Sequence, residues 1–268
     1  MSSAQWSLFC AGIGALNVQV RAGVAGLIAA FDAYREQVVL GRADPRFNAA
    51  LEAAGPVSGY TTPAELSLLY HLAVAADGPG RVVEIGSYLG RSTIVLARAV
   101  ADTNREPVVA VDPHTAALGI ENLPPRDTRA EFLANLTTAG VRDNVELVRD
   151  YSVRAAADWD GAPIRLHFID GWHTREAVRE DVGCWADCFT PDAVVVFDDY
   201  MVFDGIRQAV RELQADGKLR TEGVVVGKMA AFGPPHLLQQ APAPPGGRAL
   251  MRIPDGRRER LIQLAARS

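Results

Sequence analysis

The sequence predicts an α/β protein, with a Rossmann-like, seven-stranded, mostly parallel sheet that has helices on both faces and an antiparallel edge hairpin. Two observations lead to this fold class. Short runs of consecutive apolar residues, such as 81–86 and 164–169, alternate with helical patterns, which is typical of parallel strands buried on both faces. The first of these strands leads through a turn with two glycines into a helix, an arrangement typical of α/β folds that bind a nucleotide.

The elements follow in order along the chain. Helices and then loops are expected over 1–60, and Thr62-Pro63-Ala64-Glu65 predicts a capped helix ending near Ala76. The predicted parallel strands are 81–86, 107–111, 145–148, 164–169 and 193–197. Helices are predicted near 90–101, 127–139, 152–158, 175–188 and 203–215. The predicted edge hairpin consists of 224–226 and 229–232, joined by a turn at Gly227-Lys228.

The chain is therefore expected to have three parts. Residues 61–233 form the predicted ligand-binding domain, and the Pro/Gly-rich segment 234–268 forms a linker and a C-terminal arm. Residues 1–60 form a helical segment whose apolar stretch, 8–31, must be buried. That stretch could bury itself in a homo-oligomer or fold over the active site as a lid.

Composition excludes several classes of function. A net charge of −5 over 268 residues gives no electrostatic reason to expect a nucleic-acid or anionic-membrane partner. The apolar stretch 8–31 contains polar residues and lacks both a basic leader and an uninterrupted membrane span, so a cytoplasmic protein is expected. Three cysteines cannot form a closed set of disulfides, and Cys184 and Cys188 are predicted to pack within an apolar helix rather than to bind a metal.

The glycine turn Glu84-Ile85-Gly86-Ser87-Tyr88-Leu89-Gly90-Arg91-Ser92 is the most informative motif. Glycines let the backbone approach a ligand closely, and the following helix offers unpaired N–H groups. Glu84 and Ser87 stand where a dinucleotide turn would need bare glycine backbone, which argues against a nicotinamide-dependent oxidoreductase. Glu84 would repel phosphate but suits a ligand with a cationic amino group. Asp112 ends the next strand about 22 residues after Gly90, where nucleotide-binding folds place an acid for ribose hydroxyls. We therefore infer S-adenosylmethionine as the ligand.

Three carboxylates end two strands that are predicted to be neighbours. Asp170 follows the strand 164–169, and Asp198-Asp199 follow 193–197. Carboxylates on one edge repel one another unless a cation lies among them, and an all-oxygen set favours Mg²⁺ or another hard divalent ion. A single aspartate after a strand could instead cap a helix. His173 is expected at the same edge, as a general base, a metal ligand or a structural residue.

These motifs together resemble the class I S-adenosylmethionine-dependent methyltransferases over about residues 60–232, and more narrowly the metal-dependent O-methyltransferases that include catechol O-methyltransferase. The resemblance implies that Asp170, Asp198 and Asp199 bind the metal. It also implies that His173 is the catalytic base, in the place where catechol enzymes carry lysine, with Asp170 beside it. The cofactor-binding residues that it implies are Glu84, Gly86, Ser87, Gly90, Ser92, Asp112, Asp150, Ser152, Asp170 and Trp172.

Two motifs are similar to those of bacterial sugar and natural-product enzymes of the macrocin O-methyltransferase group. They are Asp170-Gly171-Trp172-His173 and Phe197-Asp198-Asp199-Tyr200. The resemblance therefore implies a Mg²⁺-dependent methylation of a hydroxyl on a sugar or glycosylated metabolite. A catechol or phenol is the alternative acceptor, which the absence of an evident aromatic gate in the sequence disfavours. A metal-independent N-methyltransferase is the other alternative. A non-catalytic binding module is disfavoured by the complete carboxylate set and His173.

Overall fold

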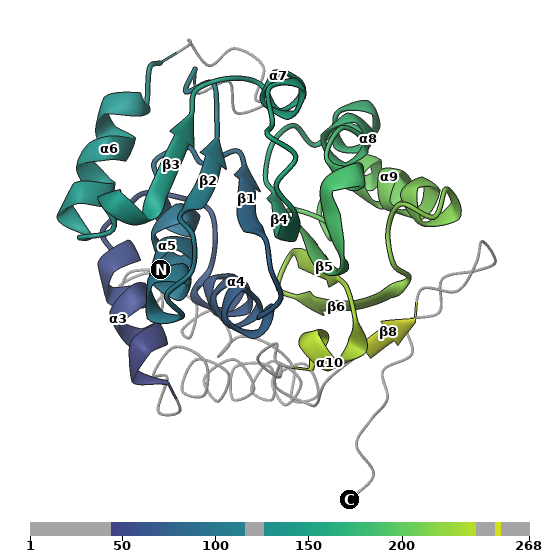
Figure 1. The fold of residues 1–268 in the computed structure, drawn as a ribbon, viewed down its shortest axis with the longest axis horizontal. Coiled ribbons are helices and arrows are strands. Elements are labelled where there is room, and N and C mark those ends of the chain that lie inside the picture. The colour runs from purple at the N-terminus through teal and green to yellow at the C-terminus, as the bar shows by residue number, and fades with distance from the viewer. Residues whose placement is uncertain (1–43, 116–125, 240–249, 253–268) are drawn as a thin grey trace, which may run out of the picture.

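The computed structural model describes residues 44–115, 126–239 and 250–252 (Figure 1). The predicted N-terminal helix within 8–31 and most of the predicted C-terminal arm lie outside the described residues. The described strands form one sheet in the order β3-β2-β1-β4-β5-β7-β6-β8. They are β1 Arg81–Ile85, β2 Val108–Val111, β3 Val145–Val148, β4 Ile164–Ile169, β5 Phe189–Phe197, β6 Glu222–Val226, β7 Met229–Phe232 and β8 Leu250–Arg252.

The predicted fold class is confirmed. Strands β1 to β5 pair in parallel. Strand β7 pairs antiparallel with β5, and also with β6, to which the predicted two-residue turn joins it. The structure adds an eighth strand, β8, which pairs antiparallel with β6. Because β1 lies between β2 and β4, the chain reverses its winding direction at β1, and such a switch point is where open α/β sheets bind their ligands.

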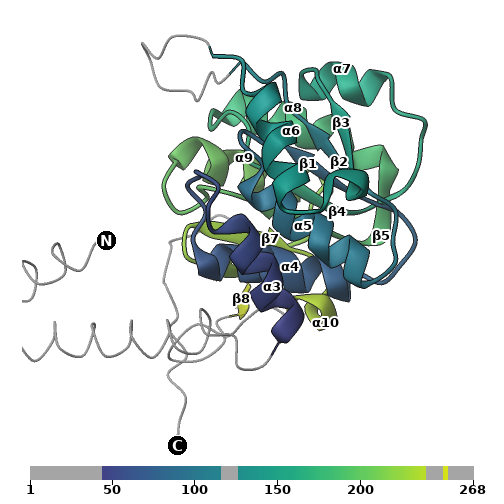
Figure 2. The ribbon, with the colours of Figure 1, turned by 90° about the vertical axis from the view of Figure 1, so that its left-hand side faces the viewer.

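Helices cover both faces of the sheet (Figures 1 and 2). The described helices are α3 Pro45–Ala54, α4 Pro63–Ala75, α5 Arg91–Asp102, α6 Arg129–Thr138, α7 Ser152–Ala157, α8 Arg175–Gly183, α9 Asp204–Ala215 and α10 Pro235–Leu238. Alternate strand residues serve opposite faces. Val82 of β1 packs in the cluster with α3, α4, α5 and α6, whereas Val83 packs in a cluster with α7 and Trp185. Among the described residues, no helix has the length and apolar character needed to cross a membrane.

The prediction of one helix over 175–188 is wrong at its end. Helix α8 ends at Gly183, and a short 3₁₀ turn, Ala186–Cys188, leads into β5. Glycine is a poor helix former, and the break lets the fully buried Trp185 turn into the core. Cys184 and Cys188 are therefore not neighbours within one helix. Both are half-buried free thiols.

The capping box predicted at the start of α4 is confirmed and has a second use. Thr62 Oγ1 accepts a hydrogen bond from the Glu65 N–H, and Glu65 Oε2 accepts one from the Thr62 N–H at 2.7 Å. The other carboxylate oxygen, Glu65 Oε1, accepts a hydrogen bond from the backbone N–H of Lys228 at 2.8 Å. A buried cap on α4 therefore also holds the turn between β6 and β7.

Candidate active site

The candidate site is a cavity of about 660 Å³ at the carboxyl ends of the parallel strands. Most of the residues that the sequence predicts for the site line this cavity. They are Gly86, Ser87, Ser92, Asp112, Asp150, Ser152, Asp170, Trp172, His173, Asp198 and Asp199. Glu84 and Gly90 lie just behind the lining, in the glycine turn that connects β1 to α5.

The glycine turn is shaped by contacts within the protein. Gly86 has a φ of +86°, and a side chain there would collide with the backbone carbonyl of Asp170, which follows β4. Gly90 has a φ of +91° and directly precedes α5, whose N-terminal end faces the cavity. Tyr88 has a φ of +45°, which costs a non-glycine residue on the order of 1–3 kcal/mol. Close packing of β1 against β4 thus gives Gly86 a role besides its predicted approach to a ligand.

Asp112 organises this turn. Its Oδ2 accepts hydrogen bonds from the backbone N–H groups of Ser87 at 2.7 Å and Tyr88 at 2.8 Å, and its Oδ1 accepts one from His114 N–H at 2.6 Å. The carboxylate still lines the cavity, so the predicted contact to ribose hydroxyls remains a prediction. The sequence analysis did not foresee the structural role. Backbone contacts between residues so far apart in sequence leave no local signal.

Glu84 lies fully buried beneath the turn. Its Oε2 accepts hydrogen bonds from the hydroxyls of Ser87 at 2.9 Å and Thr93 at 2.5 Å. Its Oε1 is buried and has no hydrogen-bond partner among the described residues. Burial raises the pKa of Glu84 to about 7, although the hydroxyls of Ser92, Thr93 and Ser87 oppose the shift. A cationic group of a ligand could donate a hydrogen bond to this unpartnered oxygen and neutralise the buried acid.

Asp150, Ser152 and Trp172, which are predicted to surround an adenine, also line the cavity. Trp172 is 49% exposed, so its ring is available to a ligand. The Ser152 hydroxyl is held in place because it accepts a hydrogen bond from Trp185 Nε1 at 3.0 Å. Asp181 of α8 also lines the cavity, and the sequence analysis missed it. Burial raises the pKa of Asp181 to about 6, with a hydrogen bond to Ser152 acting against the shift.

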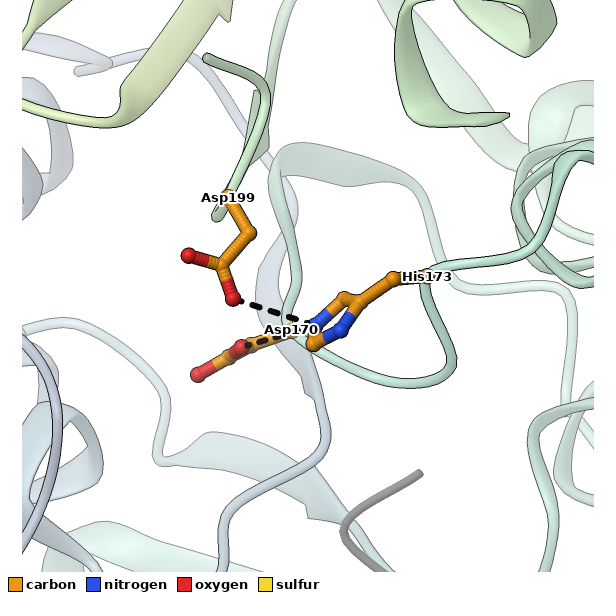
Figure 3. A group of neighbouring side chains, drawn as sticks. All are labelled: Asp170, His173 and Asp199. Atoms are coloured by element: carbon orange, nitrogen blue, oxygen red, sulfur yellow. Dashed lines mark ion pairs between the residues drawn. The ribbon is translucent and has the colours of Figure 1, made fainter. Parts of the chain in front are cut away.

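Asp170, His173 and Asp199 form a compact group at the edge of the cavity (Figure 3). His173 Nε2 lies 3.4 Å from Asp199 Oδ2 and 4.0 Å from Asp170 Oδ1. One potential ligand atom from each residue lies within 4.8 Å of the others. Burial lowers the pKa of His173 although Asp199 and Asp198 favour its charged form, so the imidazole is neutral at pH 7. Burial and the nearby Asp198 raise the pKa of Asp170 well above its usual range.

Asp198, which was expected beside these residues, has a different partner. It is 2% exposed, and its Oδ2 accepts a hydrogen bond from Lys228 Nζ at 2.5 Å. The same ammonium lies 2.9 Å from Asp199 Oδ1. Burial would lower the pKa of Lys228, but the two carboxylates outweigh burial and raise it above its usual range. The sequence identified Lys228 only as a turn residue, because the antiparallel hairpin is what carries it to the carboxylates.

Two further histidines are buried away from the cavity lining. His167 is fully buried within β4, and burial lowers its pKa to about 4. His114 follows the cavity-lining residues Asp112 and Pro113 in the chain but does not line the cavity itself. It is fully buried, and its Nδ1 forms a hydrogen bond with Thr128 Oγ1 at 2.9 Å. His114 therefore supports the loop after β2 from behind.

Comparison with known proteins finds a matching family and several similar structures. Residues 83–200 match the model of a family described as a methyltransferase domain. The cofactor-bound structure of Rv0187 from MTB is 25% identical, with a TM-score of 0.51, and the match covers 76% of this chain and 95% of that chain. An O-methyltransferase from Bacillus cereus in complex with SAH is 20% identical, with a TM-score of 0.54 and coverage of 76% and 97%. The O-methyltransferase TomG from Streptomyces achromogenes, in complex with SAM, is 21% identical, with a TM-score of 0.51 and coverage of 76% and 96%.

The strand order, with the glycine turn and the cavity at the switch point, is the fold that these O-methyltransferase structures share. Residues 83–200 therefore match a methyltransferase domain, in agreement with the resemblance that the motifs of the sequence indicated.

Proposed function

We propose that this methyltransferase transfers the methyl group of S-adenosylmethionine to a hydroxyl of a sugar or glycosylated metabolite, and that it uses Mg²⁺ or another hard divalent ion. The observation that carries the proposal is the group Asp170, His173 and Asp199, which presents two carboxylates and a neutral imidazole beside the glycine-turn cavity. A cation site and a proton acceptor next to a methyl-donor site suit the methylation of an oxygen.

The cavity fits the cofactor by its charge and by its donors. The buried, unpartnered Oε1 of Glu84 would accept the cationic amino group of the methionine part. The N-terminal end of α5 and the backbone at Gly86 and Ser87 border the same space. Asp112 would accept from the ribose hydroxyls, and Asp150, Ser152 and Trp172 would surround the adenine. The cofactor, when bound, supplies a methyl group already activated as a sulfonium.

The acidic group fits a hard divalent cation. Oxygen and imidazole donors without a thiolate favour such an ion over a soft one. We propose that Asp170 and Asp199 hold the ion, with Asp198 behind them in its pair with Lys228. A divalent ion held there would lower the pKa of an acceptor hydroxyl.

His173 would take the proton of that hydroxyl at Nε2. The imidazole is neutral at pH 7, its Nε2 is directed into the acidic group (Figure 3), and no described residue forms a hydrogen bond with this nitrogen. Phe203 stacks on the ring at 4.5 Å between centroids, which fixes the orientation of the base. The methyl transfer itself then requires chiefly that acceptor and donor be held in line.

One observation favours a second acceptor class. The sequence shows no evident aromatic gate, but Tyr60, Trp172 and Phe203 all line the cavity and are 71%, 49% and 41% exposed. Exposed rings in the cavity lining would also accept the flat face of a phenolic acceptor. A catechol or phenol therefore remains the alternative to a sugar hydroxyl.

Methyl transfer from labelled S-adenosylmethionine to a panel of glycosides, catechols and amines, with Mg²⁺ or with EDTA, tests the proposal. Labelling of glycosides that is lost in EDTA is the expected result. Labelling of catechols alone would select the second acceptor class. Labelling of amines that is insensitive to EDTA would overturn both the oxygen chemistry and the metal, and would leave the cofactor in place.

A further inference from the structure

Lys228 stands out in a chain that otherwise relies on arginine. The sequence contains two lysines, Lys218 and Lys228, among 27 basic residues. Lys218 is exposed on the surface after α9, whereas the Lys228 side chain is 20% exposed and lies against the site carboxylates. An ammonium is a compact point charge that can lie between two neighbouring carboxylates.

The backbone N–H, the backbone carbonyl and the side-chain ammonium of Lys228 each have a partner in the fold. Its backbone N–H donates to the buried carboxylate of Glu65 at 2.8 Å, and its backbone carbonyl accepts from Met201 N–H at 3.1 Å. Its Nζ reaches Asp198 Oδ2 at 2.5 Å and Asp199 Oδ1 at 2.9 Å. The ammonium is thus positioned by the β6–β7 turn and by the cap of α4, and its place at the carboxylates does not depend on a ligand.

We propose that Lys228 is a built-in cation of this site, a positioning residue that keeps Asp198 out of the metal-ligand set, shares Asp199 with the bound ion, and thereby weakens divalent-ion binding. The inference rests on the proposed metal site. Asp199 bridges the two positions, since its Oδ1 faces Lys228 and its Oδ2 faces His173. One positive charge beside a divalent ion is repulsive, and the repulsion is strong where water is largely excluded.

The Lys228 ammonium would offset part of the negative charge of the carboxylates around the ion. Asp170, Asp198 and Asp199 would otherwise place three carboxylates beside one ion, and carboxylates crowded in this way favour retention of a proton. With Lys228 paired to Asp198, a bound ion would be neutralised by fewer free carboxylates. It would therefore lower the pKa of the acceptor hydroxyl more strongly. Lys228 is absent from the cavity lining, so it acts through Asp198 and Asp199 and has no direct contact with the acceptor.

Titration of the full chain with Mn²⁺, with free Mn²⁺ followed by electron paramagnetic resonance, tests the inference without any activity measurement. Lys228→Met should bind Mn²⁺ at least about tenfold more tightly than the wild type, because a repelling charge is removed and Asp198 is released. Lys228→Arg, which keeps the charge, should stay within about threefold of the wild type. Lys218→Met is the matched control and should not differ from the wild type.

Folding of each variant is checked by thermal unfolding and by binding of S-adenosylhomocysteine. If Lys228→Met does not fold, Lys228→Gln, which keeps a hydrogen-bond donor, replaces it with the same expected gain. Folded variants whose Mn²⁺ affinity equals or falls below that of the wild type would overturn the inference. Its failure is separable from that of the metal proposal by Asp170→Asn, which should weaken Mn²⁺ binding whatever Lys228 does. Binding of Mn²⁺ by Lys228→Met alone would support the inference and refute a metal requirement in the wild type, and absence of binding in every variant would refute both.

Discussion

Glu84→Gln gives a prediction whose size can be worked from the structure. Glu84 is fully buried, and its pKa is raised from an ordinary 4.5 to about 7 in the ligand-free fold. The unfolded chain therefore releases this proton at a lower pH than the folded chain does. Between these two pKa values the folded state binds more protons, so Glu84 makes the protein less stable as the pH rises.

The shift corresponds to about 3 kcal/mol in total, at about 1.4 kcal/mol per pKa unit, and most of it falls between pH 5 and 8. Glutamine keeps the shape and the hydrogen-bonding capacity but cannot ionise. The difference in unfolding free energy between wild type and Glu84→Gln should therefore change by about 2 to 3 kcal/mol over this range, with the variant becoming relatively more stable at high pH. All other titrating groups are common to both proteins and cancel.

Urea unfolding of both proteins without cofactor at pH 5, 6, 7 and 8 measures this difference. A constant offset between the two curves would reflect altered hydrogen bonds and does not bear on the prediction. A difference that is independent of pH would refute the raised pKa of Glu84. Glu84→Gln should also bind S-adenosylmethionine at least about tenfold more weakly, since a neutral amide replaces the buried acid that we propose accepts the cationic amino group.

Three further predictions follow from other residues. His173→Ala should lower kcat by a factor of about 100 or more while the affinity for S-adenosylhomocysteine changes little, and equal losses in both would contradict its role as a base. The same variant should retain its Mn²⁺ affinity, because a large loss would make His173 a ligand instead. His167→Leu should resist acid better than the wild type. The pKa of His167 falls from 6.5 to about 4 in the fold, so the wild type loses up to about 3 kcal/mol as the pH drops from 6.5 to 4, and urea unfolding at pH 7 and 4.5 would reveal whether that loss disappears. Brief acylation of amines followed by peptide mass analysis should modify Lys218 well before Lys228, and equal rates would contradict the pairing of Lys228 with Asp198 and Asp199.

The sequence predicted the parallel strands well because each is an apolar run with a clear end. Residues that follow such runs meet at one edge of a parallel sheet, which is why Asp170 and Asp199 could be brought together without coordinates. The capping box of Thr62 and Glu65 was equally visible, since all of its partners lie within one turn of helix. What is local in the chain, or fixed by the topology of the sheet, could be predicted.

The rest depends on packing between distant segments. The pairing of Asp198 with Lys228 requires the register of an antiparallel hairpin, and a turn residue gives no sign of where its side chain will reach. The break after Gly183 depends on the burial of Trp185, which the helical pattern of 175–188 concealed. Asp112 was expected to serve a ligand, but in the fold it also holds the backbone of the glycine turn.

The most direct test of the central claim is methyl transfer by enzyme stripped with EDTA and then supplied with Mg²⁺, with S-adenosylhomocysteine affinity measured in parallel. We expect activity toward a hydroxyl acceptor to be lost on stripping and restored by Mg²⁺, with cofactor affinity nearly unchanged and with no restoration in Asp170→Asn. Full activity in the stripped wild-type enzyme would contradict the assignment of Asp170, His173 and Asp199 as a cation-assisted site for oxygen methylation.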